Sequence, residues 1–212
     1  MTDAQELLYI EDDKGRRLHY HFTPAAFASN FVPLIVVLHN EDREDMLHFE
    51  YKMWNVLTPI DTYSDNEKHT CWLGENDDHF IKELLQELIE QKADELECED
   101  DIYMYGSSMG GYGAILHALL SKANAVFAHA PLIKLSNTDT KEHNLNNFLN
   151  ATDSFPIFYL CDEDSKNNEI VSFANECKKR NIKAHLDFCP ESGDDKEHKL
   201  KKVLNMFEHV VI

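Results

Sequence analysis

Positive charge is scarce in this chain. Only 20 lysines and arginines stand against 39 aspartates and glutamates, which gives a formal net charge of −19. Such a surface repels nucleic-acid phosphates and anionic lipid, so we expect neither nucleic acid nor a membrane surface as a partner. Glycine and proline are also few, with 7 and 6 residues among 212. This composition excludes fibrous and low-complexity classes and favours one globular domain over residues 1–212.

Disulfide, metal and membrane signals are missing as well. The 5 cysteines are odd in number and form no Cys-x-x-Cys pair, which argues against a disulfide framework and a zinc ribbon. His19 and His21 could share one face of a strand, but no third ligand has a recognisable spacing, so we expect no metal. No apolar run approaches the ~20 residues of a membrane span, and no secretory signal is visible at the N-terminus. We therefore expect a cytoplasmic location.

Strand-like and helix-like segments alternate along the chain. The apolar, β-branched run at 33–40 is typical of a strand covered on both faces. Further strands are expected at 54–63, 101–106, 124–131, 155–161 and 182–189, and helices at 77–95, 109–121, 166–180 and 197–209. This alternation predicts right-handed βαβ units and a mostly parallel sheet. A hairpin of 7–12 and 17–22 would add an antiparallel edge.

One long segment breaks the alternation. Residues 132–153 are mostly polar and show no clear periodicity, although they lie between two expected strands. Long connections of this kind are often functional loops. We expect the segment to form a small lid.

The sequence Gly106-Ser107-Ser108-Met109-Gly110 joins an expected strand to an expected helix. It fits the Gly-x-Ser-x-Gly pattern of a nucleophile elbow, in which a tight strand-to-helix turn holds a serine in an unfavourable backbone conformation. The small residues let strand and helix pass close together. The N–H of Met109 would face a developing oxyanion from a helix N-terminus. The simpler alternative is a turn in which Ser107 or Ser108 caps the helix.

An elbow serine requires a general base, and the base requires an orienting acid. The strand at 155–161 ends in the acidic cluster Asp162-Glu163-Asp164, and His198 stands in an expected loop just ahead of the final helix. Each residue of the acidic cluster is a candidate for the acid, and His198 is the candidate for the base.

With these three features, "YGSSMGG", the acidic cluster and His198, the chain resembles the α/β-hydrolase superfamily over nearly its whole length. The resemblance implies an eight-stranded, mostly parallel sheet with helices on both faces, a minimal lid and a Ser-His-Asp acyl-transfer site. Because the acid of this fold usually lies on the loop past its strand, Asp164 is favoured and Asp162 comes second. Residues 100–135 also resemble O-acetyltransferases of bacterial surface polysaccharides.

The chain departs from the family pattern after the strand at 33–40. Many members carry His-Gly there, whereas this sequence has His39-Asn40. The second oxyanion donor would be a backbone N–H of this turn, at Asn40 or Glu41. The carboxylates of "HNEDRED" would disfavour a strongly anionic substrate.

Three functions follow from these patterns. The first is an esterase that acts on a small or carbohydrate ester through Ser108, His198 and Asp164, without a cofactor. The second is an O-acetyltransferase that uses the same residues, with acetyl-coenzyme A as co-substrate and a surface polysaccharide as acceptor. The third is an inactive hydrolase fold that serves as a binding module.

Overall fold

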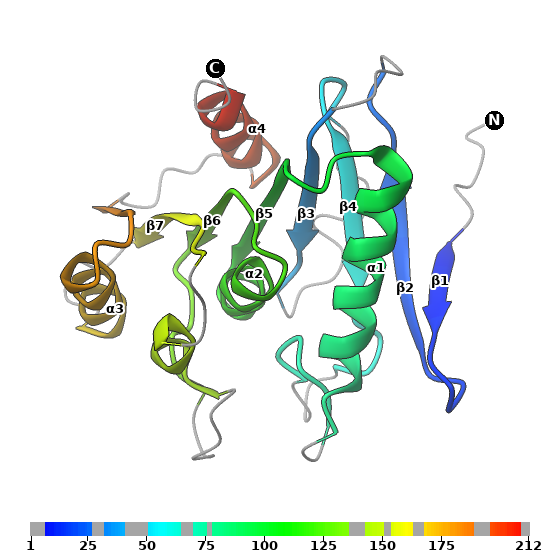
Figure 1. The fold of residues 1–212 in the computed structure, drawn as a ribbon, viewed down its shortest axis with the longest axis horizontal. Helices are drawn as coiled ribbons and strands as arrows, with labels where there is room; N and C mark the ends of the chain where they lie inside the picture. The colour runs from blue at the N-terminus through cyan, green and yellow to red at the C-terminus, as the bar shows by residue number, and fades with distance from the viewer. Residues whose placement is uncertain are drawn as a thin grey trace.

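Eight strands form one sheet in the computed structural model, which describes residues 7–26, 32–40, 51–64, 70–75, 78–135, 143–150, 154–162, 168–188 and 196–208 (Figure 1). Their order across the sheet is β1-β2-β4-β3-β5-β6-β7-β8. The strands are β1 (Leu8–Glu11), β2 (Arg17–Thr23), β3 (Leu34–Leu38), β4 (Asn55–Ile60), β5 (Ile102–Ser107), β6 (Ala125–His129), β7 (Ile157–Asp162) and β8 (Ala184–Phe188).

The sheet is parallel from β4 to β8 and antiparallel at the β1–β2 edge. The hairpin pairs Leu8 with Tyr20, and β2 pairs antiparallel with β4. The neighbours β3–β4, β3–β5, β5–β6, β6–β7 and β7–β8 are all parallel. These pairings confirm the mostly parallel sheet and its antiparallel edge.

Helices cover both faces of the sheet. They are α1 (Phe80–Leu96), α2 (Met109–Leu120), the 3-10 helix η3 (Leu145–Asn150), α3 (Asn168–Lys179) and α4 (Lys196–Glu208). Figure 1 shows α1, α2 and α3 spread along the sheet, with α4 apart from them. Among the described residues, no helix combines the length and the apolar character that a membrane span requires.

Alternate side chains of each central strand enter two separate cores. Val36 and Met104 join the core that includes α1, α2 and α3, whereas Val37 and Tyr105 join the core of α4. Because successive side chains of a strand point to opposite faces, a strand covered on both sides must be apolar throughout. This requirement explains the uninterrupted apolar run of β3, in which all five residues are buried.

The strand order reverses at β3 and β5, and this reversal determines where a site can form. From β3 the chain passes to β4 on one side, and it returns through α1 to β5 on the other side. In open α/β sheets, ligands bind beyond the carboxyl ends of the strands at such a reversal, because the two connections diverge there. Residues that follow Leu38 and Ser107 therefore flank the expected binding position.

The segment expected as a lid contains buried apolar side chains. Leu145, Phe148 and Leu149 of η3 enter the core shared with α2 and α3. The sequence pattern did not predict this helix, because six residues are too few for a periodicity to show. Residues 136–142 and 151–153 of the segment lie outside the described residues.

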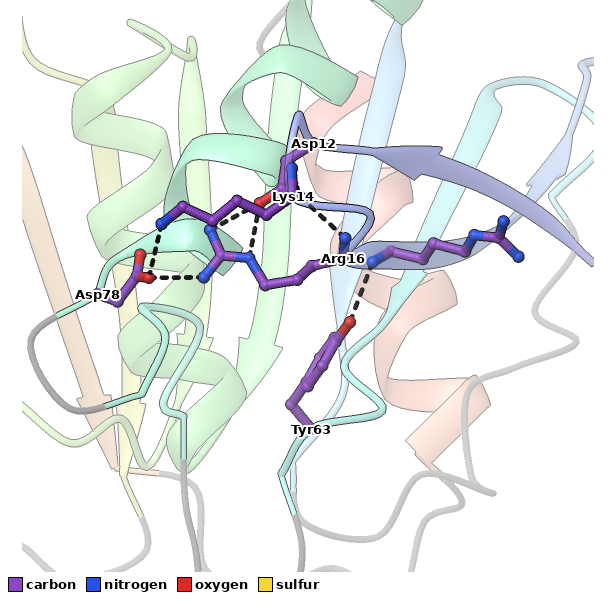
Figure 2. Close-up of polar contacts among 6 residues, drawn as sticks. Asp12, Lys14, Arg16, Tyr63 and Asp78 are labelled. Atoms are coloured by element: carbon purple, nitrogen blue, oxygen red, sulfur yellow. Dashed lines mark hydrogen bonds and ion pairs between the residues drawn. The ribbon is translucent and has the colours of Figure 1, made fainter.

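A polar cluster attaches the β1–β2 hairpin to the segment that leads into α1 (Figure 2). The Arg16 guanidinium contacts Asp12 and Asp78 carboxylate oxygens, each at 2.6 Å, and its Cζ lies 4.1 Å from the centre of the Phe80 ring. The Asp12 carboxylate also accepts the backbone N–H of Arg16 at 2.9 Å. The hydrogen bond from Arg16 lowers the pKa of Asp78. The antiparallel edge is thereby joined to the chain just before α1.

Candidate active site

Ser108 lies at the junction of β5 and α2 in a backbone conformation that side chains disfavour. Its φ is 51° and its ψ is −117°, and it is the N-cap residue of α2 although its side chain makes no capping hydrogen bond. Residues other than glycine adopt positive φ at an energetic cost, and such residues cluster at functional sites. Ser108 is also exposed, whereas Met109 and most of α2 are buried. The conformation is the one that the Gly-x-Ser-x-Gly pattern predicts.

The two motif glycines are required by close backbone contacts. A Cβ atom added at Gly106 would lie 2.1 Å from the carbonyl oxygen of Gly110. A Cβ atom added at Gly110 would lie 2.4 Å from the carbonyl oxygen of Leu38 and 2.6 Å from that of His39. Backbone oxygens cannot move aside as side chains can, so only glycine fits at both positions. This finding confirms the predicted close passage of strand and helix, and it brings the end of β3 against the elbow.

Hydrogen bonds from the end of β6 hold the elbow from the other side. The Ser108 N–H donates to the carbonyl of His129 at 2.9 Å. The Ser108 carbonyl accepts the N–H of Tyr112 at 3.1 Å and that of Leu132 at 3.3 Å. Both backbone groups of Ser108 therefore have partners, which lie in α2 and in the stretch from His129 to Leu132. His129 contributes through its backbone carbonyl.

The backbone N–H groups expected to bind the oxyanion come from α2 and from the turn after β3. Met109 is the first residue of α2, so its N–H belongs to the helix N-terminal groups that lack an acceptor within the helix. These groups carry a partial positive charge and bind anions. Asn40, the expected second donor, follows β3 and is half-buried. Glu41, the other expected donor, lies outside the described residues.

A buried histidine organises the turn after β3. His39 Nδ1 lies 2.5 Å from the Asn40 carbonyl oxygen, and His39 Nε2 lies 3.1 Å from the backbone nitrogen of Asp61. Since a carbonyl can only accept and an N–H can only donate, the proton is on Nδ1 and Nε2 accepts. The Asp61 carboxylate accepts the N–H groups of Tyr63 and Ser64 and the hydroxyl of Thr70. The turn is thus tied to the segment that follows β4.

A second buried network reaches the same turn through Trp72. The indole N–H donates to the His39 carbonyl at 3.2 Å, and the two rings meet edge to face at 4.9 Å. The Trp72 carbonyl accepts from Nε2 of His117, whose Nδ1 accepts from Gln86 at 2.7 Å. Burial lowers the pKa of His117 to about 4, so this imidazole is neutral at physiological pH. Sequence reasoning missed these residues, because 70–75 shows no periodicity that would single out Trp72.

The structure describes some of the expected partners of Ser108 and not others. Asp162 is the last residue of β7 and 4% exposed, but Glu163 and Asp164 lie outside the described residues. His198 lies in the first turn of α4, which corrects its expected place in a loop ahead of that helix. The helix starts within one residue of the expected range 197–209, so His198 falls inside it. The side chain of His198 is among those that are not described.

His19 and His21 both lie on β2. Within the described ranges, no three or more histidine, cysteine, aspartate or glutamate side chains gather as metal ligands would.

A family model matches most of the chain. The Esterase family, described as "Putative esterase", matches residues 22–202, which is most of the chain. The chain belongs to this family. It is therefore an esterase-type enzyme. No curated protein sequence gives a significant match.

Solved structures share the whole fold at low sequence identity. The fluorophosphonate-binding serine hydrolase FphF of Staphylococcus aureus is 13% identical, with a TM-score of 0.73 over 95% of this chain and 96% of that one. The S-formylglutathione hydrolase FrmB of the same organism is 15% identical, with a TM-score of 0.68 over 95% of each chain. A capsule O-acetyltransferase of Neisseria meningitidis serogroup A is 16% identical, with a TM-score of 0.67 over 95% and 94%. The fold is that of the α/β-hydrolases.

The buried His117 predicts a loss of stability in acid. Its pKa is about 4 in the folded chain against 6.5 for the free side chain, so between these values the unfolded chain binds the proton and the folded chain does not. The contribution of His117 to the free energy of unfolding is therefore fully present above pH 6.5 and is lost as the pH falls toward 4. Linkage gives a loss of about 2–3 kcal/mol at pH 4.5 from this group. Urea unfolding at pH 7 and pH 4.5 measures it.

His117→Gln removes the titrating group. We expect the unfolding free energy of this variant to fall by about 2–3 kcal/mol less than that of the wild type between pH 7 and pH 4.5. His185→Gln, at an exposed histidine of β8, provides the matched control for the loss of an imidazole. Equal pH dependence in wild type and His117→Gln would contradict the assignment.

Proposed function

We propose that this chain hydrolyses a small or carbohydrate ester through an acyl-enzyme on Ser108, with His198 as base and Asp164 as orienting acid. The observation that carries the proposal is the strained backbone of Ser108, at φ 51°, between two glycines that admit no Cβ. A helix-capping serine would not require this conformation, and Ser108 makes no side-chain capping bond. Membership of the Esterase family agrees with the proposed chemistry.

The reaction divides into two acyl transfers. The Ser108 hydroxyl attacks the ester carbonyl carbon while His198 takes its proton, and the carbonyl oxygen becomes an oxyanion. The N–H of Met109 and a second N–H, at Asn40 or Glu41, stabilise this oxyanion. The oxyanion collapses, the alcohol departs with the proton from His198, and the acyl group stays on Ser108. Water then attacks, His198 accepts its proton and returns it to Ser108, and the free acid leaves.

The acid is proposed to be Asp164 rather than Asp162. Asp162 is the last residue of β7, and its backbone pairs with Phe188 of β8. A carboxylate held so close to the sheet has less freedom to reach another loop. Asp164 follows two residues later, beyond the carboxyl end of the strand, where the loops of an open α/β sheet gather.

The second candidate is transfer of an acetyl group from acetyl-coenzyme A to a sugar hydroxyl. Hydrolysis and transfer share the acyl-enzyme and differ in whether water or an alcohol attacks it. The fold shared with the Neisseria meningitidis capsule O-acetyltransferase supports this alternative. The proposed lid, residues 132–153, would influence the choice of acceptor by controlling the access of water. The inactive binding module is not retained, because the family is one of enzymes.

Ser108→Ala should abolish turnover of short acyl esters, because it removes the hydroxyl of the residue that occupies the positive-φ position of the elbow. We expect kcat to fall by roughly 10⁴-fold or more. Ser107→Ala is the matched control, since Ser107 ends β5 beside the elbow, and it should retain activity within about an order of magnitude. Assays with and without acetyl-coenzyme A and oligosaccharide acceptors separate hydrolysis from transfer. If Ser107→Ala loses activity and Ser108→Ala keeps it, Ser107 is the nucleophile and the assignment of Ser108 is wrong.

Asp164→Asn should slow turnover far more than Asp162→Asn does. A carboxylate that accepts the histidine N–H fixes its tautomer and stabilises the imidazolium, and its loss costs about 10⁴-fold in a serine protease. We expect a comparable fall in kcat for Asp164→Asn. Steady-state kinetics of the two variants decide between the residues. The opposite order would identify Asp162 as the acid, and two mild effects would exclude both.

A further inference from the structure

The segment before α1 contains two consecutive residues in the left-handed conformation. Cys71 and Trp72 have φ values of 51° and 61°, and neither is glycine. Each is disfavoured by contact between Cβ and the backbone, so the surroundings must hold the pair in place. Trp72 is fully buried, with 0% of its surface exposed. The left-handed backbone at Cys71 and Trp72 directs the indole of Trp72 into the core, which a regular helix or strand would not do at this position.

Trp72 bridges the two elements that form the expected oxyanion site. On one side, its indole N–H donates to the His39 carbonyl at 3.2 Å. On the other side, its ring lies directly against α2, since a Cβ atom added at Gly113 would be 2.5 Å from Trp72 Cδ1. The end of β3 and the helix that begins at the elbow are therefore held by the same indole.

Hydrogen bonds also hold the backbone of Trp72 and of the residues next to it. The Trp72 backbone carbonyl accepts from the buried His117, and the next N–H groups, of Leu73 and Gly74, donate to the Thr70 carbonyl at 2.9 and 3.2 Å. The Thr70 hydroxyl reaches the Asp61 carboxylate, and Asp61 in turn donates its N–H to His39. The network therefore reaches His39 at two points, through the indole of Trp72 and through the N–H of Asp61.

These contacts determine the orientation of the peptides after β3. The His39 carbonyl and the Asn40 N–H belong to one planar peptide unit, in which the two bonds point in opposite directions. A hydrogen bond that fixes the carbonyl therefore fixes the N–H. Trp72 holds this unit, and the His39 ring holds the carbonyl of Asn40 in the next one. The peptide that carries the Asn40 N–H, one of the two candidates for the second oxyanion donor, is oriented in this way.

We propose that Trp72 is a positioning residue of the acyl-transfer site, which orients the backbone donor after β3 relative to the elbow. The inference rests on the proposed function, because the donor acts only if Ser108 forms an acyl-enzyme. Trp72 also supplies a constraint on the turn at Asn40, where the α/β-hydrolase pattern that this chain resembles has glycine. Hydrogen bonds to Trp72 and His39 supply the constraint.

The test is the substitution Trp72→Phe, which keeps an aromatic ring in the core but removes the indole N–H. Loss of an oxyanion donor costs about 10²–10³ in kcat, and a misplaced one can cost up to about 10². We therefore expect kcat for a short acyl ester to fall roughly 10- to 100-fold, with KM changed by no more than about twofold. A residue that only stabilised the fold would not separate kcat from KM.

Trp54→Phe is the matched control. Trp54 is the other of the 2 tryptophans, is equally buried, and packs against Tyr103 and Phe207 in the α4 core on the opposite face. We expect it to lower the melting temperature to a similar degree while leaving kcat within about twofold of wild type. Circular dichroism verifies that both variants are folded.

The same control supplies a readout that does not depend on Trp72→Phe folding. In Trp54→Phe, Trp72 is the only tryptophan, and reaction of Ser108 with a fluorophosphonate places a phosphoryl oxygen where the oxyanion would form. We expect a change in Trp72 fluorescence that follows adduct formation, and an unchanged spectrum would overturn the inference.

The kinetic outcomes separate the two claims. If wild type hydrolyses esters and Trp72→Phe retains its kcat, Trp72 has no positioning role and the inference alone fails. If wild type neither hydrolyses esters nor forms the adduct, the proposed function fails, and the inference fails with it.

Discussion

The close passage of β5 and α2 at Gly106 and Gly110 is the constraint on which the rest of the site depends. With the Gly110 carbonyl 2.1 Å from the position of a Cβ at Gly106, the chain must reverse direction within the residues between them. Ser108 is therefore driven into positive φ, and its exposed side chain stands at the N-terminus of a buried helix. An unfavourable local conformation is maintained because strand, helix and the β6 loop each fix part of it.

A second set of contacts joins this elbow to the neighbouring strand. Gly110 approaches the carbonyls of Leu38 and His39, and Trp72 contacts both His39 and α2. The polar groups of this region are buried, where an unpaired group would be costly, and they pair with one another in a connected network. Connected networks of this kind have few alternative arrangements. The described part of the turn after β3 is thus held by several hydrogen bonds at once.

Sequence reasoning predicted most of the architecture because the signals were local. The apolar run of β3 reflects burial on both faces of the sheet, and the apolar stripe of α1 reflects burial of one side of the helix. The spacing of Gly106, Ser108 and Gly110 indicates the elbow. The role of Trp72 could not be predicted, since it depends on contacts with His39 and Gly113, which are far away in the sequence. Nor do propensities indicate positive φ at Cys71 and Trp72. The start of α4 was predicted to within one residue, but His198 belongs to its first turn and not to a loop ahead of it, because helix ends depend on weak, local preferences.

The central claim is that the elbow exists to make Ser108 a nucleophile. The most direct measurement is peptide mapping by tandem mass spectrometry after reaction with a fluorophosphonate, which modifies an activated serine covalently. The account predicts one adduct, on Ser108, that is absent from Ser108→Ala and present in Ser107→Ala. An adduct on Ser107, or a folded wild-type protein that takes up no label, would contradict it.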